Sequence, residues 1–272
     1  MEHKGIIHFA HANGFPATAY SKLLHLLEKE YVVIAIDKLG HNPIYPVDEN
    51  WESLITELSD YIRSNAGEPV IGVGHSLGAI LTFMAAYHRP ELFREIIMIE
   101  PPLAYGPPAL LLYFAKKLRL LDRTKLVAQT RKRRTQWSSH QEAESHFLKR
   151  SPFNSFDPDC LRDYVHYGTE ASNAGVKLSF DVNIEVNIFK TTPHNLSSLS
   201  DKLSVPGMLI TGENSKSLAR YMATSFAKRY GLLLNQCKDG SHLFPLEYPQ
   251  RTADLILGAI EKLEASNKSL PH

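Results

Sequence analysis

The chain has 272 residues, of which 43% are hydrophobic and 22% charged, a composition that excludes disordered and collagen-like chains. Its net charge of +1 gives no reason to expect nucleic acid as a partner. The longest apolar runs fall short of the roughly 18 to 20 residues that cross a bilayer, so we expect no transmembrane segment. The first residues do not resemble a signal peptide, and Cys160 and Cys237 are expected to be free thiols. These features favour a cytoplasmic protein.

Short β-rich runs alternate with amphipathic stretches over the first hundred residues, which is typical of a parallel sheet covered by helices. The predicted strands in this part are Ile6–Ala10, Tyr31–Asp37, Val70–Gly74 and Glu95–Glu100. The predicted helices are Ala19–Glu30, Trp51–Ser64 and Leu77–His88. The second strand is apolar over most of its length, which predicts that it is fully buried.

The alternation stops at residue 103, and residues 103–202 consist mainly of helices and polar loops. It then resumes, with predicted strands Val205–Thr211 and Leu232–Cys237 and predicted helices Ser217–Lys228 and Pro249–Ala265. We therefore expect an α/β fold with a mostly parallel sheet flanked by helices. Residues 1–102 and 203–272 form its core, and residues 103–202 form a helical cap inserted into it.

A possible nucleophile lies between the third strand and its helix, in Gly74-His75-Ser76-Leu77-Gly78. A serine at such a tight turn has a strained backbone, and the neighbouring glycines leave room for the turn to close and expose the hydroxyl. The helix that begins at Leu77 directs free amides toward a developing oxyanion. The pattern predicts a catalytic Ser76.

A matching base follows the last predicted strand, in the segment 239–249 that contains His242. Serine is a weak nucleophile until a base within hydrogen-bonding reach accepts its proton, and imidazole suits that role at neutral pH. We therefore expect His242 to serve Ser76.

These segments resemble the α/β-hydrolase fold superfamily over nearly the whole chain except the insertion. The segment His11–Pro16 is similar to the superfamily's oxyanion loop, which implies an oxyanion hole formed by the backbone N–H groups of Phe15 and Leu77. Two residues separate His11 from Gly14, a departure that leaves Asn13 as an alternative donor. The resemblance also implies that the insertion lies over the active site and shapes the substrate pocket.

The third member of the triad departs from the commonest pattern. Many relatives carry an aspartate near Asn214 or Ser215, and this chain has none there. Some members of the superfamily hold the acid at the end of the strand after the nucleophile helix, where this chain has Glu100. A carboxylate is needed to hold and stabilise the imidazole, so we expect Glu100 in this role, with Glu213 as the second candidate.

A serine nucleophile argues against the dehalogenase and epoxide hydrolase branches, which use a carboxylate. We expect a serine hydrolase that cleaves a carboxylic ester or thioester of a small-molecule acyl substrate through an acyl-enzyme, with no metal or organic cofactor. Two alternatives stay open. One is an acyltransferase with the same triad, and the other is a non-catalytic binding protein with this fold.

The insertion also carries a concentration of positive charge, with eleven Lys/Arg and three Asp/Glu in residues 110–150. An apolar stripe runs through the same region, formed by Leu111, Phe114, Ala115, Leu118 and Leu121. Packing within the cap and a solvated basic face explain both features. The alternatives are an anionic acyl donor, such as a coenzyme A or carrier-protein thioester, and lipid at an interface.

Overall fold

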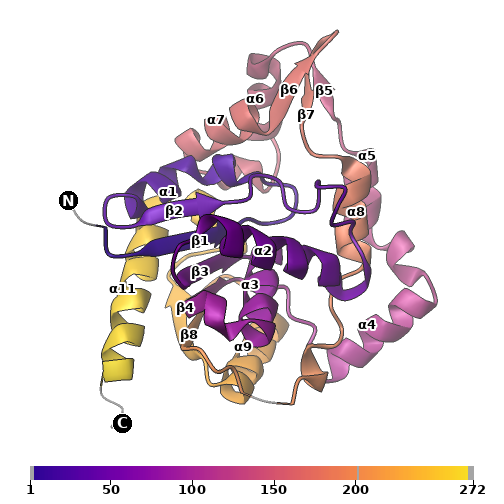
Figure 1. Ribbon diagram of the computed structural model, residues 1–272. Helices are drawn as coiled ribbons and strands as arrows, with labels where there is room; N and C mark the ends of the chain where they lie inside the picture. Colours follow the sequence, from indigo (N-terminus) through magenta and orange to yellow (C-terminus); the bar gives the residue numbers. More distant parts are fainter. Residues whose placement is uncertain (1–2, 201, 269–272) are drawn as a thin grey trace.

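A six-stranded parallel sheet forms the centre of the molecule, and the computed structural model describes residues 3–200 and 202–268 (Figure 1). The strands lie in the order β2-β1-β3-β4-β8-β9. Their bounds are β1 (Ile6–Ala10), β2 (Val32–Ala35), β3 (Val70–His75), β4 (Phe93–Ile99), β8 (Gly207–Gly212) and β9 (Leu233–Cys237). The predicted fold class is confirmed.

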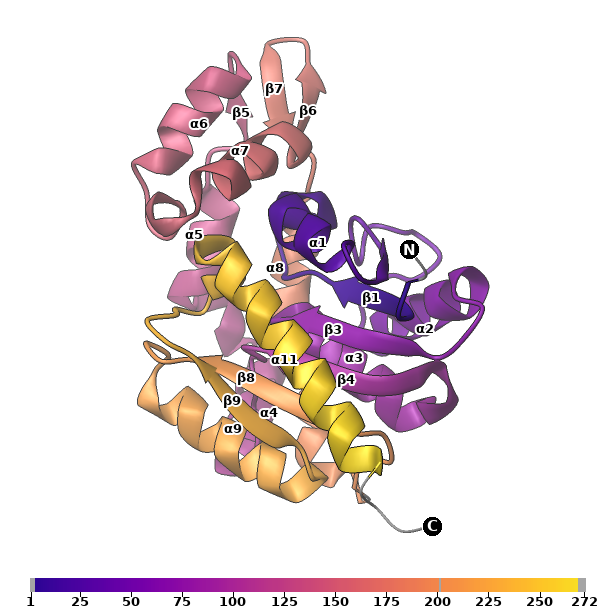
Figure 2. The ribbon, with the colours of Figure 1, turned by 90° about the vertical axis from the view of Figure 1, so that its left-hand side faces the viewer.

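Alternate side chains along the central strands enter two separate cores, one on each face of the sheet. In β4, Ile97 and Ile99 belong to one core, whereas Ile96 and Met98 belong to the other. The first core packs against α1 (Ser21–Leu27) and α11 (Pro249–Lys268), and Figure 2 shows α11 lying across the sheet. The second core packs against α2 (Glu52–Asn65), α3 (Leu77–His88) and α9 (Ser217–Tyr230).

Two predictions for the first hundred residues were wrong in detail. The strand expected to be fully buried is the edge strand β2, where Val32 is exposed and its neighbours are half-buried. An apolar run does not reveal the order in which strands pair, so it could not show that β2 lies at the edge. The helix expected over 19–30 is divided into a 3-10 turn, Ala17–Tyr20, and the shorter helix α1.

The insertion between β4 and β8 contains both helices and strands. Its helices are α4 (Pro107–Lys117), α5 (Lys125–Lys132), α6 (His140–Leu148), α7 (Pro158–Tyr167) and α8 (Val182–Lys190). The sequence did not predict its strands, β5 (Gln136–Trp137), β6 (Thr169–Ser172) and β7 (Gly175–Leu178), which form an antiparallel sheet. They are too short for a periodic pattern to show. Figure 1 shows α4, α5 and α8 beside the main sheet and the small sheet at the top.

Because the strands are parallel, the carboxyl ends of β1, β3, β4 and β9 lie on the same side of the sheet. In open α/β sheets, ligands bind at the carboxyl ends of the strands, where neighbouring connections diverge. Here β2 and β3 lie on opposite sides of β1, so the loop after β1 and the turn after β3 border such a crevice. Among the described residues, no helix is both long and apolar enough to span a membrane.

Candidate active site

Ser76 lies at a sharp turn between β3 and α3. Its backbone has φ 51° and ψ −112°, a conformation that costs free energy for a residue with a side chain. The turn closes because the positions two residues before and two residues after Ser76 are glycine. A Cβ at Gly74 would collide with the carbonyl group of Gly78, and one at Gly78 would collide with that of Ala10. The local sequence therefore allows Ser76 to project its hydroxyl from the end of the strand.

The structure brings the hydroxyl of Ser76 and the imidazole of His242 together across 166 positions of sequence. Ser76 Oγ lies 3.0 Å from His242 Nε2, and His242 Nδ1 lies 3.1 Å from Glu100 Oε2. The His242 side chain is half exposed, whereas that of Glu100 is 7% exposed. The three groups form a hydroxyl, imidazole and carboxylate chain with the order and spacing of a catalytic triad.

Glu100 is held by donors from a neighbouring loop. Its Oε1 accepts hydrogen bonds from the backbone N–H of Gly212 and the hydroxyl of Ser215, each at 2.5 Å. These contacts leave Oε2 to face His242 and stabilise a carboxylate that is almost removed from water. Ser215 thus holds the carboxylate of Glu100, the residue that follows β4. The second candidate, Glu213, accepts the backbone N–H of Asp239 at 2.9 Å.

A series of buried hydrogen bonds connects the turn at Ser76 to the loop that carries His242. The sequence did not predict this connection. His75 Nε2 lies 2.9 Å from the carbonyl oxygen of His242, and His75 Nδ1 lies 2.8 Å from the hydroxyl of Tyr20. Burial, with a smaller contribution from nearby His242, lowers the pKa of His75 to about 3. The ring is therefore neutral. Because a carbonyl oxygen only accepts, Nε2 donates to His242 and Nδ1 accepts from Tyr20.

The loop after β1 carries the residues expected to supply one donor of the oxyanion hole. The backbone N–H of Phe15 donates to the carbonyl oxygen of Ala12 at 3.1 Å within a tight turn, so it is not free to meet an oxyanion. In the described part of the chain, the N–H groups of Asn13 and Leu77 make no hydrogen bond, and both residues line the same cavity. Asn13 was the alternative donor, and this turn geometry favours it over Phe15.

His11 fixes the start of this loop. Burial lowers its pKa to about 4, so the ring is neutral. Its Nε2 accepts the backbone N–H of Leu39 at 2.8 Å, and its Nδ1 lies 2.8 Å from the carbonyl oxygen of Ala12. Both ring nitrogens are therefore used to hold backbone, which explains a histidine at this position without catalysis.

The Ser76 hydroxyl borders a cavity of about 470 Å³. Core and insertion both supply its walls, and the lining is mainly apolar, with residues that include Phe15, Trp51, Leu77, Leu126, Phe153, Tyr164, Ile188 and Leu243. The volume lies in the range of small-molecule sites. The insertion is thus one wall of the space above Ser76 and His242.

One ion pair interrupts the apolar lining. Arg133 contacts Glu185 with Nη2–Oε2 and Nη1–Oε1 distances of 2.6 and 3.1 Å. Burial raises the pKa of Glu185, and the nearby Arg133 opposes that rise. The carbonyl oxygen of Glu185 also accepts the side-chain amide of Asn13 at 3.0 Å. Helix α8 is therefore tied to the loop after β1 and to the residue that follows α5.

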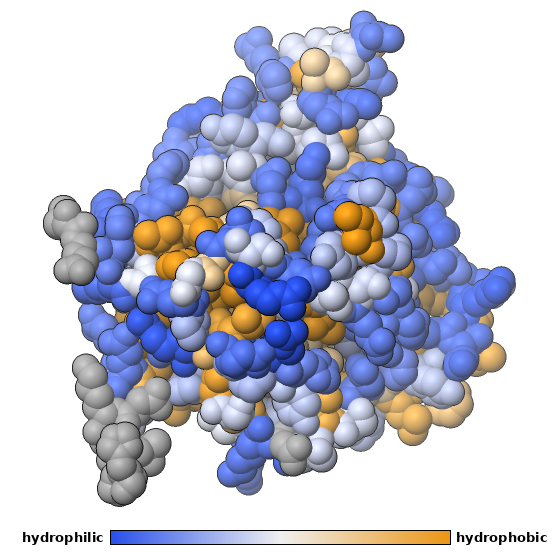
Figure 3. All heavy atoms as spheres, viewed as in Figure 1, coloured by the Kyte–Doolittle hydropathy of each residue, from blue (hydrophilic) through white to orange (hydrophobic). Residues whose placement is uncertain are grey.

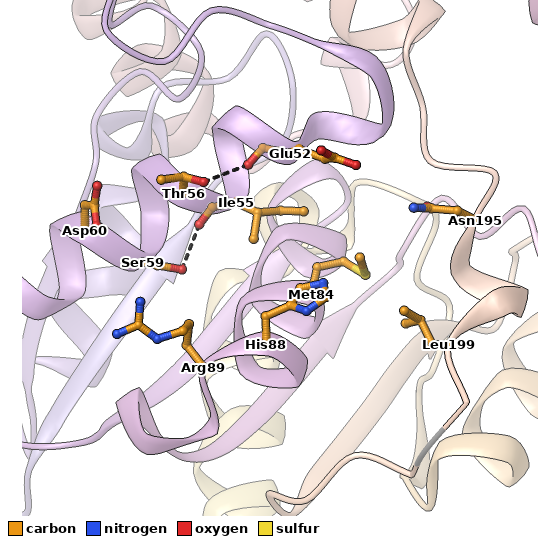
Figure 4. Close-up of a pocket in the computed structure, with 10 residues that line it drawn as sticks. All are labelled: Glu52, Ile55, Thr56, Ser59, Asp60, Met84, His88, Arg89, Asn195 and Leu199. Carbon is orange, nitrogen blue, oxygen red and sulfur yellow. Dashed lines mark hydrogen bonds between the residues drawn. The ribbon is translucent and has the colours of Figure 1, made fainter.

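A second cavity of similar volume, about 470 Å³, lies between α2, α3 and the segment around Asn195 and Leu199 (Figure 4). The hydroxyl of Ser59 there donates to the carbonyl oxygen of Ile55 at 2.8 Å, and Thr56 donates to Glu52 in the same manner. Both hydroxyls are thus bound within their own helix. Volume does not distinguish the two cavities, but the chemistry favours the one at Ser76.

The order of the strands and the sharp turn at Ser76 are those of an α/β-hydrolase fold, and the hydroxyl–imidazole–carboxylate chain lies where that fold binds its ligands. A profile of the alpha/beta hydrolase family matches residues 9–255, and the chain belongs to this family. Since that match spans most of the core and the insertion, the family assignment does not depend on the triad alone.

Individual relatives share the fold at low sequence identity. The Abhydrolase domain-containing protein AKT2 of Alternaria alternata is 24% identical over 233 residues, covering 72% of this chain and 84% of that protein. E-2-(acetamidomethylene)succinate hydrolase has a similar structure, with a TM-score of 0.77 and 19% identity over 96% of this chain and 93% of that one. The thioesterase domain from the curacin biosynthetic pathway is also similar in structure, with a TM-score of 0.69 and 19% identity over 94% of this chain and 92% of that one.

Proposed function

We propose that the chain is a serine hydrolase that cleaves a carboxylic ester or thioester through an acyl-enzyme on Ser76. The observation that carries the proposal is the continuous chain from Ser76 Oγ to His242 to Glu100 at a cavity wall. A serine, an imidazole and a buried carboxylate in this arrangement activate the hydroxyl for attack on a carbonyl carbon.

In the first half of the reaction, Ser76 Oγ attacks the carbonyl carbon while His242 Nε2 takes the hydroxyl proton. Glu100 accepts a hydrogen bond from the Nδ1–H group of His242 and stabilises the imidazolium that forms. The tetrahedral intermediate then expels the alcohol or thiol, which receives the proton from Nε2. Ser76 is left as an ester of the acyl group.

In the second half, water replaces the leaving group. His242 takes a proton from the water, whose oxygen attacks the acyl carbon, and returns the proton to Ser76 as the carboxylic acid departs. In both halves, negative charge develops on the former carbonyl oxygen. We assign its stabilisation to the backbone N–H groups of Asn13 and Leu77, helped by the amino-terminal end of α3.

The lining of the cavity supports an acyl or leaving group with an apolar body. Aromatic and aliphatic side chains from both core and insertion surround the space beside Ser76. Residues 131–134 form a basic run within the insertion. The positive charge of Arg133 is already matched by Glu185, which favours a structural role for this part of the run. Two other members are also paired, Arg131 with Asp122 and Arg134 with Glu142.

Hydrolysis of short p-nitrophenyl esters and acyl thioesters tests the proposal. We expect Ser76→Ala to lower kcat by about a thousandfold or more. Ser59→Ala in the second cavity is the matched control and should retain the wild-type rate. Equal activity of wild type and Ser76→Ala, or loss of activity only in Ser59→Ala, would contradict the proposal.

A further inference from the structure

Helix α4 presents its apolar residues to solvent. Its exposed side chains include Leu110, Leu111 and Phe114, and Leu118 follows at its end, with exposed fractions of 60, 72, 51 and 67%. At 100° per residue these four positions span an arc of about 100°. We call them the α4 patch. A surface helix normally turns such a stripe toward the core, as the sequence led us to expect, so this orientation requires another explanation.

The opposite side of α4 fixes this orientation. Ala109 is buried, and Lys116 points inward, with a side chain that is 7% exposed. The Lys116 ammonium lies 2.5 Å from Glu49 Oε1 and donates to the carbonyl oxygen of Thr192 at 2.8 Å. Rotating the helix to bury the α4 patch would break these contacts and leave their polar groups unpaired.

The apolar surface continues beyond the helix. Leu120 and Leu126 are about half exposed, and Leu126 also lines the cavity beside Ser76. Figure 3 shows hydrophobic side chains at the lower right edge of the molecule, where Figure 1 places α4. Grouped exposed apolar side chains of this kind mark an interaction surface.

The surroundings of the patch are strongly basic. Residues 107–132 contain seven Lys/Arg and one acid, Asp122, whose carboxylate is paired with both Arg131 and Lys190 at 2.8 Å. Several exposed cations beside the patch form no ion pair with any described residue, namely Lys117, Arg119, Arg123 and Lys125. Their charge is available to an external partner.

We propose that the α4 patch and its basic border dock onto an anionic lipid bilayer. Large apolar side chains next to lysine and arginine complement the acyl region and the negative headgroups at once. A second copy of this chain would cover the apolar side chains but would bring the same positive charge against itself. The charge therefore selects the membrane over self-association.

Co-sedimentation with vesicles tests this docking, which does not depend on the catalytic proposal. We expect the wild type to bind phosphatidylcholine vesicles containing phosphatidylserine about tenfold more tightly than phosphatidylcholine alone. The triple variant Leu111→Gln/Phe114→Gln/Leu118→Gln should lose about tenfold in binding. Leu218→Gln, at an exposed position of α9, is the control and should bind as the wild type does.

A second variant tests the charge separately. Arg119→Gln/Arg123→Gln/Lys125→Gln should lose the preference for phosphatidylserine. Circular dichroism and thermal melting should show that all variants fold, since the changed side chains are exposed. Absence of wild-type binding to phosphatidylserine vesicles, or binding that survives the triple apolar change, would overturn the proposal. A concentration-dependent dimer that this triple variant abolishes, without vesicle binding, would assign the surface to a second copy instead.

Discussion

The imidazole of His75 and the backbone carbonyl of His242 are 2.9 Å apart, which links the residue before Ser76 to the residue proposed as the base. The same imidazole contacts the hydroxyl of Tyr20, whose oxygen also accepts the backbone N–H of Ala12 at 3.4 Å. Tyr20 and His75 therefore connect the loop after β1 with the histidine loop, and we assign both as positioning residues for His242.

Tyr20→Phe tests that connection. Loss of the hydroxyl removes the donor to His75 Nδ1 and weakens the preference for the tautomer that donates to His242. We predict that kcat for ester hydrolysis falls about tenfold while KM stays near the wild-type value. Tyr230→Phe is the matched control, because Tyr230 is also buried and donates to a backbone carbonyl, that of Leu196. Equal kcat losses in the two variants would show that the effect is general destabilisation.

The identity of the acid is tested by comparing Glu100→Gln with Glu213→Gln. The amide at position 100 would not stabilise the imidazolium, so we expect kcat to fall by about a hundredfold or more while the protein stays folded. Glu213 contacts the Asp239 amide, and its substitution should change kcat by less than about threefold. Steady-state kinetics with one ester substrate distinguish the two. A large loss in Glu213→Gln alone would move the acid to that loop.

We predict that the buried Arg133–Glu185 ion pair contributes more to the free energy of unfolding than the exposed Arg131–Asp122 pair. Removing the guanidinium in Arg133→Gln leaves a buried carboxyl group without its charged partner, which should cost about 2 kcal/mol or more. Arg131→Gln breaks an exposed pair with Asp122 and should cost less than about 1 kcal/mol. Urea unfolding of both variants provides the measurement. Similar losses would mean that burial does not strengthen the pair.

Glu95 contributes stability that falls as pH rises through weakly acidic values. Both of its carboxylate oxygens are buried and lack a hydrogen-bond partner among the described residues. Burial raises its pKa from 4.5 to about 7, against the opposing charge of Arg94. The folded state thus favours the protonated form, and that stability is present below pH 4.5 and lost as pH rises through 7. The full loss is on the order of 3 kcal/mol.

Glu95→Gln should remove this contribution, so the variant should unfold at a higher urea concentration than the wild type at pH 8. Glu57, whose pKa burial also raises to about 7, contributes a slope in the same direction. His75 and His11, whose pKa values burial lowers, contribute a slope in the opposite direction, and neither is changed in the variant. Glu28→Gln, at an exposed position, should leave the profile unchanged. A stability difference between Glu95→Gln and the wild type that does not change between pH 4.5 and 8 would contradict this account of Glu95.

The sequence allowed the fold to be predicted because strand and helix periodicities alternate clearly in the core. Ser76, Glu100 and His242 could be proposed because each follows a recognisable strand, and parallel strands gather their carboxyl ends at one edge. Backbone turns are less accessible to such reasoning. The hydrogen bond from Phe15 to Ala12 depends on local geometry that residue types alone do not specify.

Features set by tertiary packing were missed for a different reason. Tyr20 and His75 are 55 positions apart, and neither has a neighbouring motif that points to the other. The outward orientation of α4 depends on what Lys116 meets inside the fold, whereas the apolar spacing is the same for a buried or an exposed stripe. The edge position of β2 follows from the order of pairing across the whole sheet.

The most direct test of the central claim is to map the residue modified by a fluorophosphonate probe, using peptide mass spectrometry on the wild type and on His242→Ala. We predict one adduct, on the peptide that contains Ser76, formed at least about a hundredfold more slowly in the variant. An adduct on another residue, or folded wild-type protein that never reacts, would contradict nucleophilic catalysis by Ser76.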